Sequence, residues 1–137
     1  MRKELFFLTA TYYDILAGTN QIKQIQTDKD ARVEVNRLSR SLVDTFGDPI
    51  NPNDILEGQQ QPALSVWIYD NAIGEYLSNA PVPVVNLFGS GMYAGYLAQP
   101  LLLGKNAVLS ITVYNNYNTY GVGYLQLAFI GKKVFDR

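Results

Sequence analysis

Short runs in which apolar and polar residues alternate, separated by turn signals, cover much of this 137-residue chain. The clearest runs lie at 31–37, 64–70 and 107–114. Successive side chains of a β-strand point to opposite faces, so each run predicts a strand with one buried face. From these runs and the last long strand, we expect an inner face made of Ala31, Val33, Val35, Leu64, Val66, Ile68, Ala107, Leu109, Ile111, Val113, Leu125, Leu127 and Phe129.

The alternation slips once, just after Val35, where the next apolar positions are Leu38 and Leu42. A slip of this kind permits a β-bulge or a short helical turn. A helix over 31–43 is the main local alternative to a strand.

Several weaker segments carry less regular signals. Residues 21–27 are polar and predict an edge or weak strand. Residues 80–83 contain two prolines, which cannot donate to a sheet, so they predict an edge strand or a loop. We expect a brief strand at 84–88, a long exposed loop at 46–62 and a hairpin loop at 115–121.

These segments add up to about eight strands with no long capped helix and no alternation of strands with helices. This pattern predicts an all-β fold, an antiparallel β-sandwich that is jelly-roll-like. The chain shows no internal repeat, and its length fits one domain spanning 1–137.

Composition narrows the chemistry that we expect. The chain has no cysteine and no histidine, which excludes disulfides, thiolate zinc sites, cysteine nucleophiles and Ser-His-Asp triads. The net charge of −1 argues against a general nucleic-acid binder. Glycine, proline, asparagine and serine interrupt every long uncharged stretch, so we expect no membrane span. We expect no enzymatic activity, cofactor or metal.

The charge is distributed very unevenly. From Tyr76 to Gly131 the only charged residue is Lys105. One explanation is that these strands are central and that their loops are solvated by uncharged polar residues. The explanation that we favour is coverage by other subunits, because interface cores are poor in charge and rich in aromatic residues.

Three segments carry weak signals for small-ligand or catalytic chemistry. The glycines at 88–91 lack the Lys-Ser/Thr ending and the helix of a phosphate-binding loop. The carboxylates within 28–34 lack the spacing of a calcium loop, and basic residues stand among them. The carboxylates within 48–57 share an acidic loop without any sign of a walled cleft. We interpret all three as ordinary loops or turns.

Aromatic residues supply the candidate interaction surface. Two of them point away from the core in the strand 64–70, and others gather in the glycine-rich segment 88–96 and in the Tyr/Asn segment 114–120. Tyrosine and asparagine can contact a protein, stack on a sugar or form a solvated hairpin tip. The candidate subunit interface consists of Trp67, Tyr69, Phe88, Met92, Tyr93, Tyr96, Tyr114, Tyr117 and Tyr120.

Five segments, 26–35, 88–96, 99–103, 104–113 and 125–133, follow one another in an order that resembles a known class. Together they are similar to small β-sandwich structural proteins of bacteriophage virions, which decorate, cement or extend capsids. One departure is the Lys-Lys pair after the final glycine, where an arginine or tyrosine is usual in that class.

The resemblance implies a non-enzymatic protein located in the virion. It also implies a homo-oligomer, often a trimer or pentamer, that binds the major capsid protein or other virion proteins. It transfers no catalytic residue. The alternative that we keep is a carbohydrate- or receptor-binding β-sandwich module of a phage fibre or a secreted protein.

Overall fold

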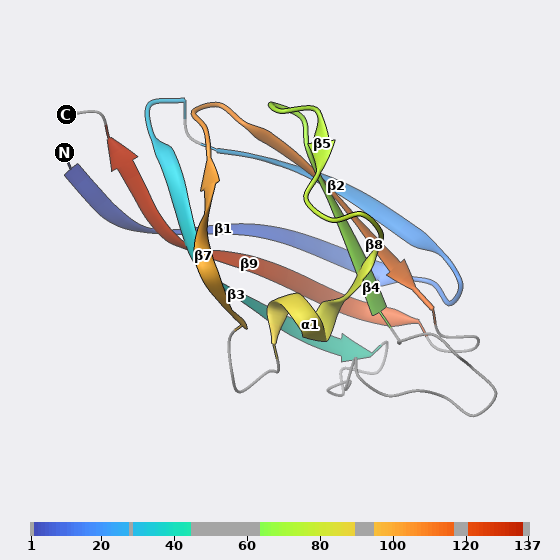
Figure 1. The fold of residues 1–137 in the computed structure, drawn as a ribbon. Helices are drawn as coiled ribbons and strands as arrows, with labels where there is room; N and C mark the ends of the chain where they lie inside the picture. Colours follow the sequence, from blue (N-terminus) through green and yellow to red (C-terminus); the bar gives the residue numbers. More distant parts are fainter. Residues whose placement is uncertain (1, 28, 45–63, 90–94, 117–120, 136–137) are drawn as a thin grey trace.

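Long strands that pair with distant parts of the chain build almost all of the fold (Figure 1). The computed structural model describes residues 2–27, 29–44, 64–89, 95–116 and 121–135. The predicted loop 46–62 lies outside these residues. The elements are β1 (Arg2–Ile15), β2 (Asn20–Gln26), β3 (Arg32–Asp44), β4 (Leu64–Asp70), β5 (Glu75–Tyr76), β6 (Val82–Pro83), α1 (Val84–Phe88), β7 (Gly95–Leu103), β8 (Val108–Asn115) and β9 (Val122–Phe135).

The strands form two antiparallel sheets, ordered β1-β9-β3-β7 and β2-β8-β4-β5, and β6 pairs with β4. Four of the pairings are nested: β1 with β9, β2 with β8, β3 with β7, and β4 with β5. The chain therefore resembles one long hairpin, closed at β4–β5, whose two arms are wound into a sandwich. This arrangement is the jelly-roll order, so the predicted fold class is confirmed.

The nested pairing corrects the expected hairpin at 115–121. β8 belongs to one sheet and β9 to the other, so the connection after Asn115 crosses between the sheets. Two adjacent alternating runs favour a hairpin only when nothing else competes for their edges. Here β8 pairs with β2 and β4, and β9 pairs with β1 and β3.

The expected strand at 84–88 is wrong, because these residues form the short helix α1. Val84 and Phe88 are both fully buried. Their spacing of four residues places both side chains on the same face of a helix, whereas a five-residue run carries no clear strand period. Pro83 precedes the helix, where its missing N–H costs nothing.

The predicted slip after Val35 is a β-bulge. The pairing register of β3 with both of its neighbours shifts between Val35 and Arg37. Gly131 lies opposite Val35, and a Cβ added there would stand 1.8 Å from the Glu34 carbonyl oxygen. Glycine is therefore required for the close approach of β9 to the bulge, and the alternative helix over 31–43 is excluded.

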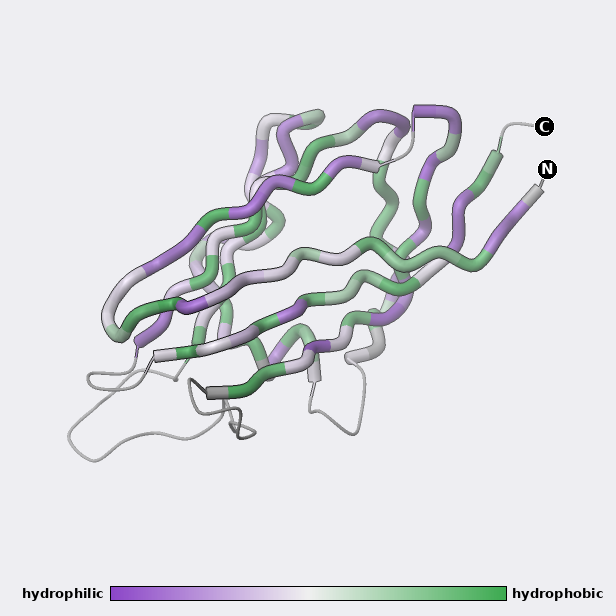
Figure 2. The backbone as a smooth tube through the Cα atoms, turned by 180° about the vertical axis from the view of Figure 1, so that it is seen from behind, coloured by the Kyte–Doolittle hydropathy of each residue, from purple (hydrophilic) through white to green (hydrophobic). Residues whose placement is uncertain are grey.

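The core lies between the two sheets and contains every residue of the predicted inner face. Figure 2 shows the alternation of hydrophobic and hydrophilic positions along the strands that produces this arrangement. The weak strand 21–27 is the edge strand β2, as predicted. Residues 80–83 also behave as predicted, because Val82 and Pro83 add a two-residue strand beside β4.

Candidate functional site

The structure divides the predicted interface residues into three groups. Trp67, Tyr69 and Tyr114 lie on the outer face of the β2-β8-β4-β5 sheet, since their alternating partners face the core. Phe88 lies in the core. For the remaining predicted residues, the structure describes either no position or no side chain: Met92, Tyr93, Tyr96, Tyr117 and Tyr120.

Phe88 corrects the prediction of a surface contact. Its side chain is fully buried, and its ring centre lies 5.7 Å from that of Phe129 in an edge-to-face arrangement. Helix α1 directs this side chain into the core between the two sheets. Phe88 therefore stabilises the core and is not available to a neighbouring subunit.

An aromatic cluster of Trp67, Tyr69 and Tyr76 stands on the outer face of the sheet around β4. The rings of Trp67 and Tyr76 stack with centres 3.8 Å apart, and Tyr69 meets Tyr76 edge-on at 4.9 Å. The indole nitrogen of Trp67 donates a hydrogen bond to the Ser78 carbonyl oxygen at 3.1 Å. One face of the indole is thus covered from within the chain, and Tyr76, which is 47% exposed, is the outer ring of the cluster.

Tyr76 was not among the predicted residues, although the sequence carries a signal for it. The turn at 71–74 joins β4 to β5 and brings Tyr76 directly opposite Tyr69. Cross-strand aromatic pairs stabilise antiparallel sheets, so a tyrosine at this distance beyond a tight turn is a candidate partner for Tyr69.

The outer face around this cluster carries no charge at its described positions. Across the sheet, Ile22 of β2, Thr112 of β8 and Trp67 of β4 stand in one row. Ile22 is 60% exposed. We call this surface the aromatic face, and its described outward positions are Asn20, Ile22, Gln24, Gln26, Ser65, Trp67, Tyr69, Tyr76, Val108, Ser110, Thr112 and Tyr114.

The outer face of the other sheet also has an uncharged central region, which ends toward the chain termini at Arg37, opposite Ile130. We call this surface the Thr–Ser face, and its central outward positions are Thr9, Thr11, Ser39, Ser41, Gln126 and Ala128. Charged side chains gather toward the end where the chain termini lie, as in the ion pair between Lys3 Nζ and Glu34 Oε2 at 3.7 Å. The central part of this surface is therefore polar without being ionic.

The uneven charge of the sequence now has a structural explanation in two parts. β8 and β9 are central strands, each flanked by a neighbour on both sides, and their inward residues form much of the core. Up to Gly131, their outward residues lie on the aromatic face and the Thr–Ser face and are uncharged as well, whereas Lys132, opposite Leu5, begins the charged end of β9. Core burial accounts for the first set of positions only.

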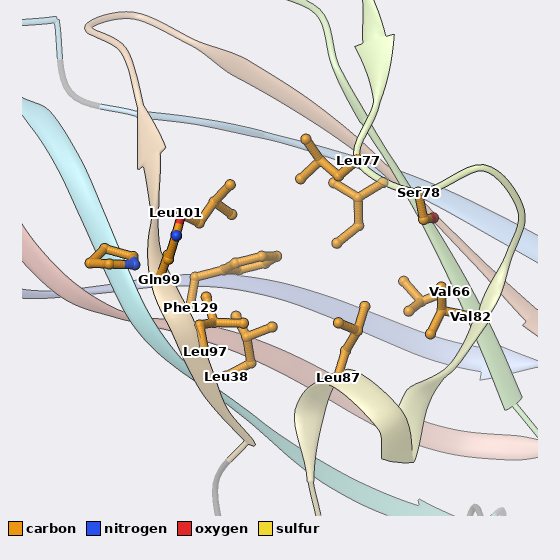
Figure 3. A pocket seen from close by; sticks show the side chains of 12 residues that line it. Leu38, Val66, Leu77, Ser78, Val82, Leu87, Leu97, Gln99, Leu101 and Phe129 are labelled. Carbon is orange, nitrogen blue, oxygen red and sulfur yellow. The ribbon is translucent and has the colours of Figure 1, made fainter.

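A cavity of about 350 Å³ opens between the two sheets beside β7 and α1 (Figure 3). Leu97 and Phe129 line one side of it, and Val66 and Leu77 line the other. The lining includes the polar side chains of Ser78 and Gln99, and none of its described residues is ionisable. This lining offers apolar contact rather than acid–base chemistry. Sequence reasoning missed the cavity because its wall is assembled from segments far apart in the chain.

Two polar side chains, the half-buried Arg40 and the buried Asn115, have backbone partners. Arg40 Nε donates to the Gly89 carbonyl oxygen at 3.0 Å and so links β3 to the end of α1, and desolvation lowers the pKa of this guanidinium. Asn115 Nδ2 donates to the Ile15 carbonyl oxygen at 3.1 Å. Within the described ranges, no group of three or more acidic side chains could hold a metal ion.

In the part of the chain that the structure describes, no helix has the length and apolar character needed to cross a membrane. No protein-family model matches the chain, and no curated protein matches it.

Proposed function

We propose that this chain is a non-enzymatic structural subunit of a bacteriophage virion, which associates with itself and binds neighbouring capsid subunits. The observation that carries the proposal is the absence of charge across the middle of both outer faces. Support also comes from the jelly-roll order, which is found in viral capsid domains, and from the sequence resemblance described above.

The physical argument concerns desolvation. A protein surface that faces water normally carries Lys, Arg, Asp and Glu, which also limit association. A face of Thr, Ser, Ala and Tyr loses little hydration free energy when a partner covers it, because no charge has to be buried without a counter-charge. Ile22 and Tyr76 add exposed apolar area on the aromatic face.

Repetition would make such faces effective in a shell. Each contact need contribute only modest affinity, since a subunit held at several sites gains from effective concentration. The localisation that follows is the virion, and the partners are copies of this chain and the major capsid protein.

The first experiment places one lysine on each face. Ser41 and Ile22 are exposed outward positions of the Thr–Ser face and the aromatic face. We expect Ser41→Lys and Ile22→Lys to shift the particle mass of the concentrated protein toward smaller species, as measured by sedimentation velocity. The matched control is Ala72→Lys in the exposed turn between β4 and β5, which should leave the mass unchanged.

Each variant should keep the circular dichroism spectrum and the urea midpoint of the parent protein, because both faces are solvent-accessible in the isolated chain. A strictly monomeric parent protein over the whole concentration range would refute self-association. Equal effects of all three lysines would show that net charge, and not the two faces, controls assembly.

The alternative function, carbohydrate or receptor binding, draws support from the exposed ring of Tyr76. Its position outside Trp67 offers one flat surface on which a sugar could stack. A glycan array with the parent protein and Tyr76→Ala tests this alternative, which requires reproducible hits that the variant loses. The predicted contribution of Tyr117 lies outside the described residues.

A further inference from the structure

The sandwich has open strand edges, which differ in the features that hinder pairing with another strand. β1 and β7 are the edges of one sheet, while β2 and the short pair β5 and β6 are the edges of the other. An open edge exposes backbone N–H and C=O groups that can pair with another strand. Proteins usually prevent such pairing with proline, charge, bulges or very short strands.

Three of the edges carry such protection. β7 contains Pro100, and its pairing with β3 is interrupted between Tyr96 and Leu101. β2 carries the exposed Lys23 in its middle. β5 and β6 are two residues long, and Pro83 occupies one of them. Pairing along any of these edges would be short or obstructed.

β1 lacks this protection over most of its length. It is 14 residues long, and the stretch from Leu5 to Tyr13 contains no charge, proline or glycine. Leu5 and Phe7 are 66% and 54% exposed. Gln21 Nε2 covers one end of the edge by donating to the carbonyl oxygens of Tyr13, at 2.9 Å, and Asp14, at 3.3 Å.

The same contact shows which backbone groups point outward. The Tyr13 carbonyl faces Gln21 and therefore points away from β9. The N–H and C=O of one residue in an antiparallel strand point to the same side, and the side alternates along the strand. The backbone groups of Leu5, Phe7, Thr9 and Thr11 thus face the open edge, and no described residue pairs with them.

We infer that the β1 edge pairs antiparallel with the β1 edge of a second copy of this chain, which joins two four-stranded sheets into one continuous sheet. This inference deepens the proposed function and rests on it, since it names the edge through which two subunits associate. A two-fold axis satisfies the exposed groups of both copies with one self-complementary contact.

Avoidance of like charges selects the register. β1 carries Glu4 near its start and Asp14 near its end. An axis through Leu8 keeps these two carboxylates apart, and it places Phe7 opposite Thr9. An axis through Thr9 would instead place Glu4 beside Asp14, and like charges directly opposite each other destabilise a sheet.

The decisive experiment compares two double variants that both add charge at the same exposed positions. Phe7→Lys/Thr9→Lys puts lysine opposite lysine twice across the axis, whereas Phe7→Lys/Thr9→Glu puts lysine opposite glutamate twice. Both variants lose the same phenylalanine and threonine, so the comparison cancels the loss of these side chains and leaves the charges at positions 7 and 9 as the difference. Sedimentation velocity of the full chain at low salt gives the dimer dissociation constant of each.

We expect the Lys/Glu variant to dimerise at least about tenfold more tightly than the Lys/Lys variant, with a smaller ratio at high salt. We also expect Ser41→Lys to retain the dimer, because Ser41 lies on a face and not on this edge. Slow amide exchange at Thr9 in concentrated parent protein, lost on dilution, would support the same pairing.

Equal dissociation constants for the two double variants would overturn the inference. If Ser41→Lys abolishes all association while both double variants remain assembled, the faces hold the subunits together, and the proposed function stands without the edge. A parent protein that is monomeric at every concentration and shows no slow exchange at Thr9 would overturn both.

Discussion

Replacing Tyr12 with phenylalanine tests how the two sheets are held together. Tyr12 projects from β1 into the core with no exposed surface, and its hydroxyl donates to the Ile111 carbonyl oxygen of β8 at 2.7 Å. This hydrogen bond crosses from one sheet to the other. Tyr12→Phe removes the bond and keeps the ring, so we expect a loss of about 1 kcal/mol in the free energy of unfolding near neutral pH.

The effect should depend on pH with a defined sign. Burial raises the pKa of Tyr12 in the folded protein well above the usual tyrosine value of about 10. The unfolded chain therefore loses this proton at a lower pH than the folded chain does. The stability linked to Tyr12 is complete below about pH 10 and falls by about 1.4 kcal/mol per pH unit above it, until the pH reaches the folded pKa.

The two effects have opposite signs at high pH and should cancel. By about pH 11 the titration cost exceeds the ~1 kcal/mol contribution of the hydrogen bond, so the phenylalanine variant should be at least as stable as the parent protein. Urea unfolding of both proteins across the alkaline range, followed by the fluorescence of the single tryptophan, Trp67, measures the difference. The other nine tyrosines are common to both proteins and drop out of the comparison.

A difference in unfolding free energy that stays constant between about pH 8 and about pH 11 would refute this reasoning. It would mean that Tyr12 ionises equally easily in the folded and unfolded chains, and hence that its hydroxyl reaches water. A difference of zero at neutral pH would instead show that the bond to Ile111 adds no net stability.

Two other substitutions test the packing of the sandwich. Gly131→Ala should destabilise the fold by several kcal/mol, because its Cβ would overlap the Glu34 carbonyl. The control Gly104→Ala, which has open space around its Cβ, should change the free energy of unfolding by no more than about 0.5 kcal/mol. Equal urea midpoints for the two variants would contradict the close approach at the bulge. Asn115→Leu should cost about 1–3 kcal/mol in thermal or urea unfolding, since it leaves the buried Ile15 carbonyl without this donor, and an unchanged midpoint would show that another group replaces the amide.

The sequence predictions were correct where a local pattern of residues decides the structure, and wrong where contacts between distant segments decide it. The period of two in segments such as 64–70 and 107–114 is a local property, and it identified each inner face correctly. The slip after Val35 likewise indicated the bulge in β3. The segment 84–88 is too short to reveal its period, and its helix depends on the space between the sheets that Val84 and Phe88 fill.

The candidate site was predicted less completely, for the same reason. Trp67 and Tyr69 could be assigned to an outer face from the alternation alone. Their contact with Tyr76 depends on how the chain returns after the turn, and the cavity beside β7 depends on the separation of two sheets. Whether the predicted aromatic surfaces contact another subunit stays a prediction.

The sequence by itself determined that this chain is built from alternating strands, which side of each strand is buried, and that the second half offers almost no charge to its surroundings. These properties follow from residue type and spacing. Only the tertiary structure decided which strands pair, because nested pairing joins the first strand to the last and depends on contacts across the whole chain. It thereby also decided that β1 forms an open edge and that the uncharged outward residues gather in the middle of each outer face, the two features on which the proposed assembly rests.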